Sequence, residues 1–114
     1  MDLAQMLFSF SGRINRMPYW MLGIGLSVVS WLIIVVAGLV LPETLFYVGT
    51  VGVVIASAWI GLALSVKRAH DRGRSGWFVL VGFVPLLNLW PLVEFYFLRG
   101  TFGQNDYGPD PLGG

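Results

Sequence analysis

His70 and Asp71 are the one place in this 114-residue sequence on which acid–base catalysis could be built. Adjacent side chains on a helix point about 100° apart, so these two residues do not face each other as a ready acid–base pair. A metal site needs three or four ligands, and a chain with one histidine and no cysteine could add only scattered carboxylates. The sequence also lacks a nucleophile elbow, a phosphate-binding glycine loop and a His-rich helix. We therefore predict no catalytic, cofactor or metal site, and we expect Asp71 to order its segment by pairing with Arg68 or Arg74.

The segment around this pair is basic, because it also contains Lys67, Arg68, Arg72 and Arg74. Anionic headgroups attract such charges near a membrane surface by about 1 kcal/mol each. The arginines of this segment, together with His70 and Asp71, are therefore candidates for an interaction site. The alternative interpretation is that the basic residues only set the orientation of the chain in a membrane.

Long apolar stretches lie on both sides of the basic segment. Apolar residues make up 56% of the sequence and charged residues 11%, against roughly 45–50% and about 25% in soluble domains. Glu43 is the only charged residue from 19 to 66, and Glu94 is the only one from 77 to 98. A soluble chain this short could not bury so much apolar surface. The predicted partner of this apolar surface is the lipid bilayer. A net charge of +1 argues against nucleic acid as a partner.

The apolar residues divide into three segments, at about 19–41, 45–66 and 77–98. Each is long enough to cross a hydrocarbon core of about 30 Å. The first two are joined by Pro42-Glu43-Thr44, a turn short enough to require an antiparallel return. We predict an all-α membrane protein, a polytopic helical bundle with one integral membrane domain over residues 1–114. A basic loop at 67–76 and a polar tail at 99–114 complete it.

The third apolar segment is expected to break between Pro85 and Asn88. Proline ends or kinks a helix, and Asn88 is well placed to cap a second arm. The two arms, about 77–84 and 89–98, either stack into one kinked span or fold back as a re-entrant hairpin; we favour the kinked span. Asn88 and Glu94 are the candidate intramembrane polar residues of this segment. Glu94 also lies close enough to the end of the span to pair with Arg99.

Basic residues at the span ends predict the orientation. Arg13 and Arg16 precede the first segment, the basic loop follows the second, and the turn between the first two segments has no Lys or Arg. Because cytoplasmic loops carry the excess of basic residues, we expect the N-terminus and the basic loop in the cytoplasm. A kinked third span would place the tail outside, and a hairpin would return it to the cytoplasm. Residues 1–10 carry one apolar stripe, which indicates either a short interfacial helix or a frayed N-terminus.

Three motifs occur in order along the chain. They are Phe10-Ser11-Gly12-Arg13-Ile14-Asn15-Arg16 before Tyr19-Trp20, then Arg68-Ala69-His70-Asp71-Arg72-Gly73-Arg74-Ser75-Gly76-Trp77, and Gly103-Gln104-Asn105-Asp106-Tyr107-Gly108-Pro109-Asp110-Pro111. With them the chain resembles, over nearly its whole length, the small bacterial inner-membrane proteins grouped as domain of unknown function 805. The resemblance implies a bacterial inner-membrane location and brings no known activity, substrate or cofactor. The residues that the family motifs single out are Arg13, Arg16, Tyr19, His70, Asp71, Asn105 and Tyr107.

Two functional hypotheses follow from the sequence. The first is a non-enzymatic module that binds anionic phospholipid, a membrane-protein partner or a second copy of itself through its cytoplasmic motifs. In that hypothesis the small residues Ser57, Gly61 and Ser65, four apart, pack helices together. The alternative is a small oligomeric transporter or channel that uses the broken third segment, since interrupted helices often line ion and substrate sites.

Overall fold

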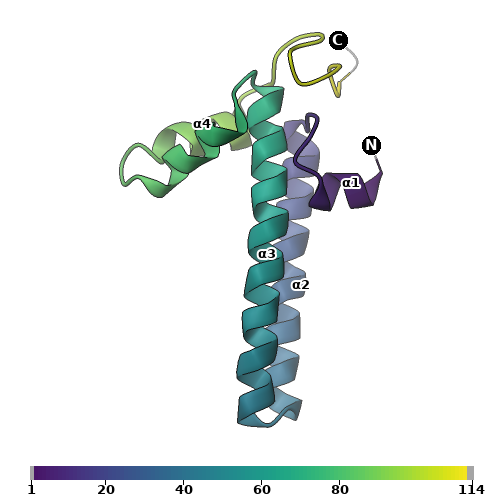
Figure 1. Ribbon diagram of the computed structural model, residues 1–114, viewed down its shortest axis with the longest axis vertical. Coiled ribbons are helices and arrows are strands. Elements are labelled where there is room, and N and C mark those ends of the chain that lie inside the picture. The colour runs from purple at the N-terminus through teal and green to yellow at the C-terminus, as the bar shows by residue number, and fades with distance from the viewer. Residues whose placement is uncertain (1, 113–114) are drawn as a thin grey trace.

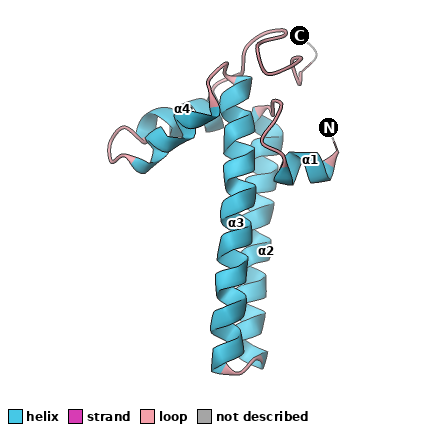
Figure 2. Cartoon of the chain, viewed as in Figure 1, coloured by secondary structure: helices cyan, strands magenta, loops and turns pink. Residues whose placement is uncertain are grey.

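The structure is helical and has no β-sheet within the residues it describes. The computed structural model describes residues 2–112, in which the sole β-type contact is an isolated bridge between Asn105 and Gly108. Its elements, in chain order, are α1 (Leu3–Phe8), α2 (Arg16–Val40), α3 (Glu43–Asp71), the 3₁₀ helix η1 (Gly76–Phe83) and α4 (Leu89–Phe97). α2 and α3 form a long antiparallel hairpin, and the other elements gather around one of its ends (Figure 1, Figure 2). We call the long pair the hairpin, and the gathered elements with their loops and the tail (residues 98–112) the head.

The hairpin has the length and composition of two membrane-spanning helices. α2 has 25 residues and α3 has 29, so at about 1.5 Å per residue each exceeds a hydrocarbon core of about 30 Å. The chain reverses at Leu41 and Pro42, in agreement with the predicted turn. Apolar side chains point outward along both helices; Leu39 is 81% exposed and Val48 is 65% exposed. A long apolar surface of this kind is suited to contact with lipid.

The small residues predicted to pack helices together do so only in part. The hydroxyl groups of Ser30 and Ser57 hydrogen-bond across the hairpin at 2.9 Å, and those of Tyr19 and Ser65 do so at 3.1 Å. A Cβ atom added at Gly61 would meet nothing within 4 Å, so Gly61 is not a point of close helix contact. The stripe of Ser57, Gly61 and Ser65 therefore provides hydrogen bonds between the helices rather than close approach of their backbones.

α3 continues beyond the predicted span, through the basic residues to Asp71. Residues 67–71, expected in a loop, form its last turn, and the loop is limited to residues 72–75. Gly73 ends the helix in the left-handed conformation (φ +76°). Its amide donates to the His70 carbonyl at 3.0 Å, and the Arg74 amide donates to the Ala69 carbonyl at 2.9 Å. These two bonds form a Schellman cap, which favours glycine, and basic side chains suit the negative end of the helix dipole.

The third apolar segment folds back on itself. Residues 76–97, which we call the apolar arm, contain η1, a turn at residues 84–88, and α4 packed against η1. The Phe78 ring lies 5.5 Å from that of Trp90 and 5.9 Å from that of Phe95. The two arms therefore fold back on each other, and the favoured stacking of the arms into one kinked span is not what the structure has. Pro85 breaks the helix as predicted, and Leu86 (φ +70°) then reverses the chain.

The N-terminal stripe forms a short helix, α1, that lies against α3 (Figure 1). Asp2 and Gln5 form a capping box at its start. At its end, the Lys67 ammonium group donates to the carbonyl oxygens of Gln5 and Met6. Lys67 is fully buried, so its charge is used inside the head to bind the C-terminal end of α1.

Candidate functional site

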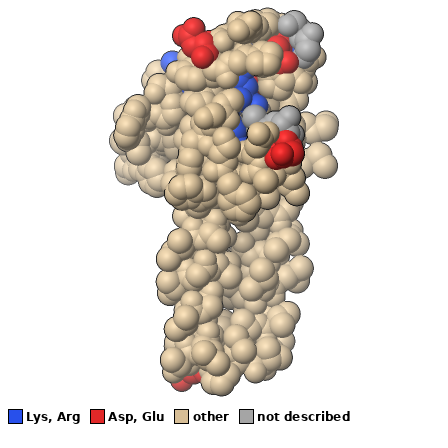
Figure 3. Space-filling model, turned by 45° about the vertical axis from the view of Figure 1, so that its right-hand side comes forward, with Lys and Arg blue, Asp and Glu red and all other residues tan. Residues whose placement is uncertain are grey.

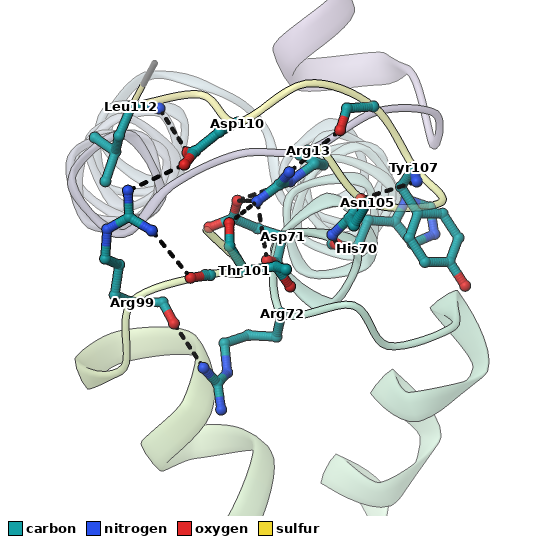
Figure 4. Close-up of polar contacts among 12 residues, drawn as sticks. Arg13, His70, Asp71, Arg72, Arg99, Thr101, Asn105, Tyr107, Asp110 and Leu112 are labelled. Atoms are coloured by element: carbon teal, nitrogen blue, oxygen red, sulfur yellow. Dashed lines mark hydrogen bonds and ion pairs between the residues drawn. The ribbon is translucent and has the colours of Figure 1, made fainter. Parts of the chain in front are cut away.

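Asp71, the last residue of α3, is the centre of a buried ion-pair network. Its Oδ1 lies 3.0 Å from Arg13 Nη2, and its Oδ2 lies 2.7 Å from Arg68 Nη1. All three side chains are at most 2% exposed. Arg68 and Asp71 meet because residues three apart share one face of a helix, whereas Arg13 arrives from the segment before α2 (Figure 4). The predicted pairing of Asp71 with Arg68 is present, and Arg13 joins it.

Arg13 connects this network to the tail. Its Nη2 donates to the Thr101 carbonyl at 2.6 Å, and its Nη1 donates to the carbonyl oxygens of Gly103 at 2.6 Å and Gly108 at 3.2 Å. The Thr101 amide in turn donates to the Asp71 carbonyl at 2.6 Å. The tail is thereby held across the end of α3 (Figure 4).

Arg68 connects the network to α4. Its Nε donates to the Phe95 carbonyl at 2.8 Å, and its Nη2 donates to the carbonyl oxygens of Glu94, at 3.2 Å, and Leu98. Carbonyl groups in the last turn of a helix lack partners within the helix. Arg68 therefore supplies both the missing donors and a positive charge at the negative end of α4.

Glu94 is the centre of a second network, between the loop after α3 and the apolar arm. Its carboxylate lies 3.3 Å from Arg72 Nε and 2.8 Å from Arg74 Nη2, and it accepts the Trp90 indole N–H. The hydrogen bond to Glu94 raises the pKa of Arg74. Two ion pairs that the sequence allowed are not formed. Glu94 does not pair with Arg99, and Arg74 pairs with Glu94 rather than with Asp71.

His70 brings the first and third motifs into contact. Its ring stacks on that of Tyr107, with centroids 4.0 Å apart and planes inclined by 1°. Asn105 Nδ2 donates to the His70 carbonyl at 2.8 Å, and Asn105 Oδ1 accepts from the Tyr107 amide at 2.9 Å. On its other side, His70 Nδ1 lies 2.9 Å from the Gly12 carbonyl oxygen. His70 and Asp71 thus have separate partners, as expected for adjacent residues on a helix.

A third ion pair holds the far part of the tail, where Arg99 Nη2 lies 3.0 Å from Asp110 Oδ2. The Leu112 amide donates to the same carboxylate at 2.9 Å, and the Gly103 amide does so at 3.0 Å. These two backbone bonds and the Arg99 charge lower the pKa of Asp110 to about 2. Its carboxylate is therefore ionised at neutral pH.

Two candidate residues lie outside these networks. Arg16, in the first turn of α2, donates from Nη1 to the Phe97 carbonyl at 2.7 Å and makes no ion pair with any residue from 2 to 112. Asn88 precedes α4, but its side chain makes no capping bond, so the predicted capping bond is absent. Asn88 instead lines an apolar groove of about 480 Å³ between α3 and the apolar arm.

The other candidates come together in the head, and the residues that hold them there include some without a sequence signal. Gly100 and Thr101 contact Asp71 through their backbones, so no side-chain chemistry marks them. What the arrangement does is connect the segment before α2, the end of α3, the apolar arm and the tail. Within the described residues, no group of three His, Asp or Glu side chains is placed to hold a metal ion.

The fold and the site define a small helical membrane protein with two candidate spans and a head in which its three motifs meet. The chain belongs to the family described as "Protein of unknown function (DUF805)", which it matches over residues 7–109.

Three relatives of the chain occur in Escherichia coli (strain K12), and two of them are named as inner membrane proteins. "Inner membrane protein YhaI" is 38% identical over 102 residues, covering 90% of this chain and 85% of that protein. "Uncharacterized protein YiiR" is 34% identical over 137 residues, with coverage of 96% and 90%. "Inner membrane protein YhaH" is 31% identical over 109 residues, with coverage of 90% and 86%. No solved structure matches the chain.

Proposed function

We propose that the protein is a non-enzymatic, multi-pass module of the bacterial inner membrane that binds anionic phospholipid through its head, at the cytoplasmic face of the membrane. The observation that carries this proposal is the uneven distribution of charge. All seven Lys and Arg residues lie at the head end, whereas one of the six Asp and Glu residues, Glu43, lies at the opposite tip. Seven positive and five negative charges leave a net charge of +2 at the head end. Figure 3 shows charged side chains at the two ends and an uncharged surface between them.

The positive excess lies in the two ion-pair networks, because in each of them two arginines share one carboxylate. Arg13 and Arg68 share Asp71, and Arg72 and Arg74 share Glu94, so each network has one positive charge in excess. The first network is buried. In the second, the side chains of Arg72 and Arg74 are 27% and 38% exposed. A positive potential at the surface of the head attracts anionic headgroups.

The excess of basic residues also supports the orientation, with the head in the cytoplasm. Because the apolar arm returns to the head, we expect residue 102 on the cytoplasmic side and residue 44 outside. The chain has no cysteine, so Phe102→Cys and Thr44→Cys, both at exposed positions, report each side separately. An impermeant thiol reagent applied to spheroplasts should label the Thr44→Cys variant and should reach Phe102→Cys only after the membrane is opened. Labelling of Phe102→Cys on intact spheroplasts would contradict the proposed topology.

Neither helix of the apolar arm is long enough to cross the membrane by itself. Its 3₁₀ helix has 8 residues and α4 has 9, which correspond to about 16 Å and about 14 Å. We propose that the arm enters the membrane from the cytoplasmic side and returns. Its irregular turn is acceptable at that depth only where protein or headgroups satisfy its backbone.

The proposed function is tested by measuring whether the protein selects anionic over neutral lipid. In vesicles of phosphatidylcholine, a spin-labelled phosphatidylglycerol should be immobilised by the protein more than a spin-labelled phosphatidylcholine. The preference should fall in 1 M salt, where the Debye length is about 3 Å rather than about 10 Å at 0.1 M. Glu43→Gln, which removes a charge at the opposite tip, should leave the preference unchanged. Equal immobilisation of the two lipids at low salt would contradict the proposal.

The transport alternative has less support. It relied on Asn88 and Glu94 as polar residues of a broken span, and the Glu94 carboxylate is bonded to Arg72, Arg74 and Trp90. The groove beside Asn88 is lined mainly by apolar and small residues. Lipid binding uses the charge that the head presents, and we therefore prefer it to transport and to a membrane-protein partner.

A further inference from the structure

A cleft of about 660 Å³ opens between the head end of α2, the C-terminal end of α4 and the tail. Its lining is of two kinds. Arg16 and Arg99 lie on the side of the head, whereas Met17, Trp20 and Met21 lie on the side that continues along α2. One cleft therefore joins a cationic edge to an apolar wall.

Arg16 gives the cleft its net charge. Five of the seven cations are in ion pairs with carboxylates, and Lys67 is fully buried against α1. Arg99 also lines the cleft, but Asp110 neutralises it. Arg16 is thus the exposed cation that has no carboxylate partner among residues 2–112. One of its N–H groups donates to the Phe97 carbonyl, which leaves other donors of the guanidinium group for an anion.

The apolar wall continues out of the cleft as a stripe along α2. Met17, Met21, Ile24 and Val28 are 68%, 65%, 55% and 52% exposed, and their spacing of four, three and four places them on one face of the helix. This stripe runs from the head toward the middle of the hairpin. An acyl chain lying on it would have its polar end beside Arg16.

Aromatic residues fix the floor of the cleft at this level. The Trp20 indole donates to the Tyr96 carbonyl at 2.7 Å, and the two rings are 4.6 Å apart. Tryptophan and tyrosine are enriched where a membrane protein meets the headgroup region. In the proposed orientation we therefore expect the cleft at the depth at which a phospholipid changes from phosphate to acyl chain.

We propose that this cleft is a binding site for one anionic phospholipid, with its phosphate at Arg16 and an acyl chain along the stripe from Met17 to Val28. The proposal rests on the proposed function and makes it specific. A free phosphate would use Arg16 but not the stripe, and a neutral lipid would use the stripe but gain nothing from the net charge. Charge and apolar surface together select an anionic lipid.

Native mass spectrometry of the full chain in mild detergent tests this site. The wild type should retain one phosphatidylglycerol more tightly than phosphatidylcholine with the same acyl chains. Arg16→Gln should weaken retention of phosphatidylglycerol about fivefold, the equivalent of about 1 kcal/mol for one cation near a headgroup. Arg16→Lys, which keeps the charge, should retain the lipid. Arg74→Gln, which removes a charge of the second network at the same end but outside the cleft, should weaken retention less than Arg16→Gln, and Glu43→Gln at the opposite tip should leave it unchanged. Glycerol phosphate, which has no acyl chain, should not displace the lipid.

The other outcomes separate this site from the proposed function. If Arg74→Gln weakens retention as much as Arg16→Gln, or if only Arg74→Gln does so, the cleft is not the site and lipid binding by the head remains. Displacement by glycerol phosphate would show a site for soluble anions and overturn the lipid assignment. Equal retention of phosphatidylglycerol and phosphatidylcholine by the wild type would overturn both proposals.

Discussion

Replacement of Asp71 by asparagine is expected to destabilise the closed head by about 3–5 kcal/mol, as for other buried ion pairs that lose one partner. The carboxylate is 2% exposed and lies between two arginines that are at most 1% exposed. Asparagine has nearly the same size but no charge, so Arg13 and Arg68 would remain buried as two uncompensated cations. Hydrogen exchange at the Thr101 amide, which donates to the Asp71 carbonyl, measures the loss. It should become about a hundredfold faster or more.

Two variants show whether charge is the cause. Arg13→Gln removes the bonds to the tail but leaves Arg68 and Asp71 as a neutral pair, so its effect should be smaller than that of Asp71→Asn. Asp106→Asn changes an exposed carboxylate that forms no ion pair with residues 2–112, and it should have no effect. Amides inside the hairpin provide the reference within each sample. If Asp71→Asn exchanges no faster at Thr101 than Asp106→Asn, the network does not hold the head together.

The hairpin could be predicted because its signals are local. Each apolar stretch is long enough to require a membrane-spanning helix, and Pro42 sets the turn between the two helices. The break at Pro85 could also be predicted, since proline interrupts a helix wherever it occurs in its interior. The helical state of residues 67–71 was missed because basic residues near a membrane suggest a loop, whereas Gly73 ends the helix further along.

The direction of the chain after Pro85 could not be predicted from local signals. It depends on Arg68, which binds carbonyl groups of α4 more than 25 residues away in the sequence, and on Arg13, which binds carbonyl groups of the tail. Every residue except proline offers the same backbone groups, so the acceptors leave no pattern in the sequence. Because these backbone acceptors could not be foreseen, the basic residues were all predicted to lie at the membrane surface. Three of them, Arg13, Lys67 and Arg68, are instead buried in the head.

Replacement of Gly100 by alanine should open the tail from α3, with a loss of about 3 kcal/mol, at the upper end for overpacked sites. A Cβ atom there would lie 2.5 Å from the Asp71 carbonyl oxygen and closer still to its carboxylate. The tail would have to move away, and the bond between the Thr101 amide and Asp71 would break. The exchange rate at Thr101 should rise about a hundredfold. Gly82→Ala is the matched control, because a Cβ there meets nothing within 4 Å, and its effect should stay within about 0.5 kcal/mol. Equal exchange rates in the two variants would mean that the head accommodates the added Cβ atom without breaking the bond between the Thr101 amide and Asp71, and would contradict the prediction.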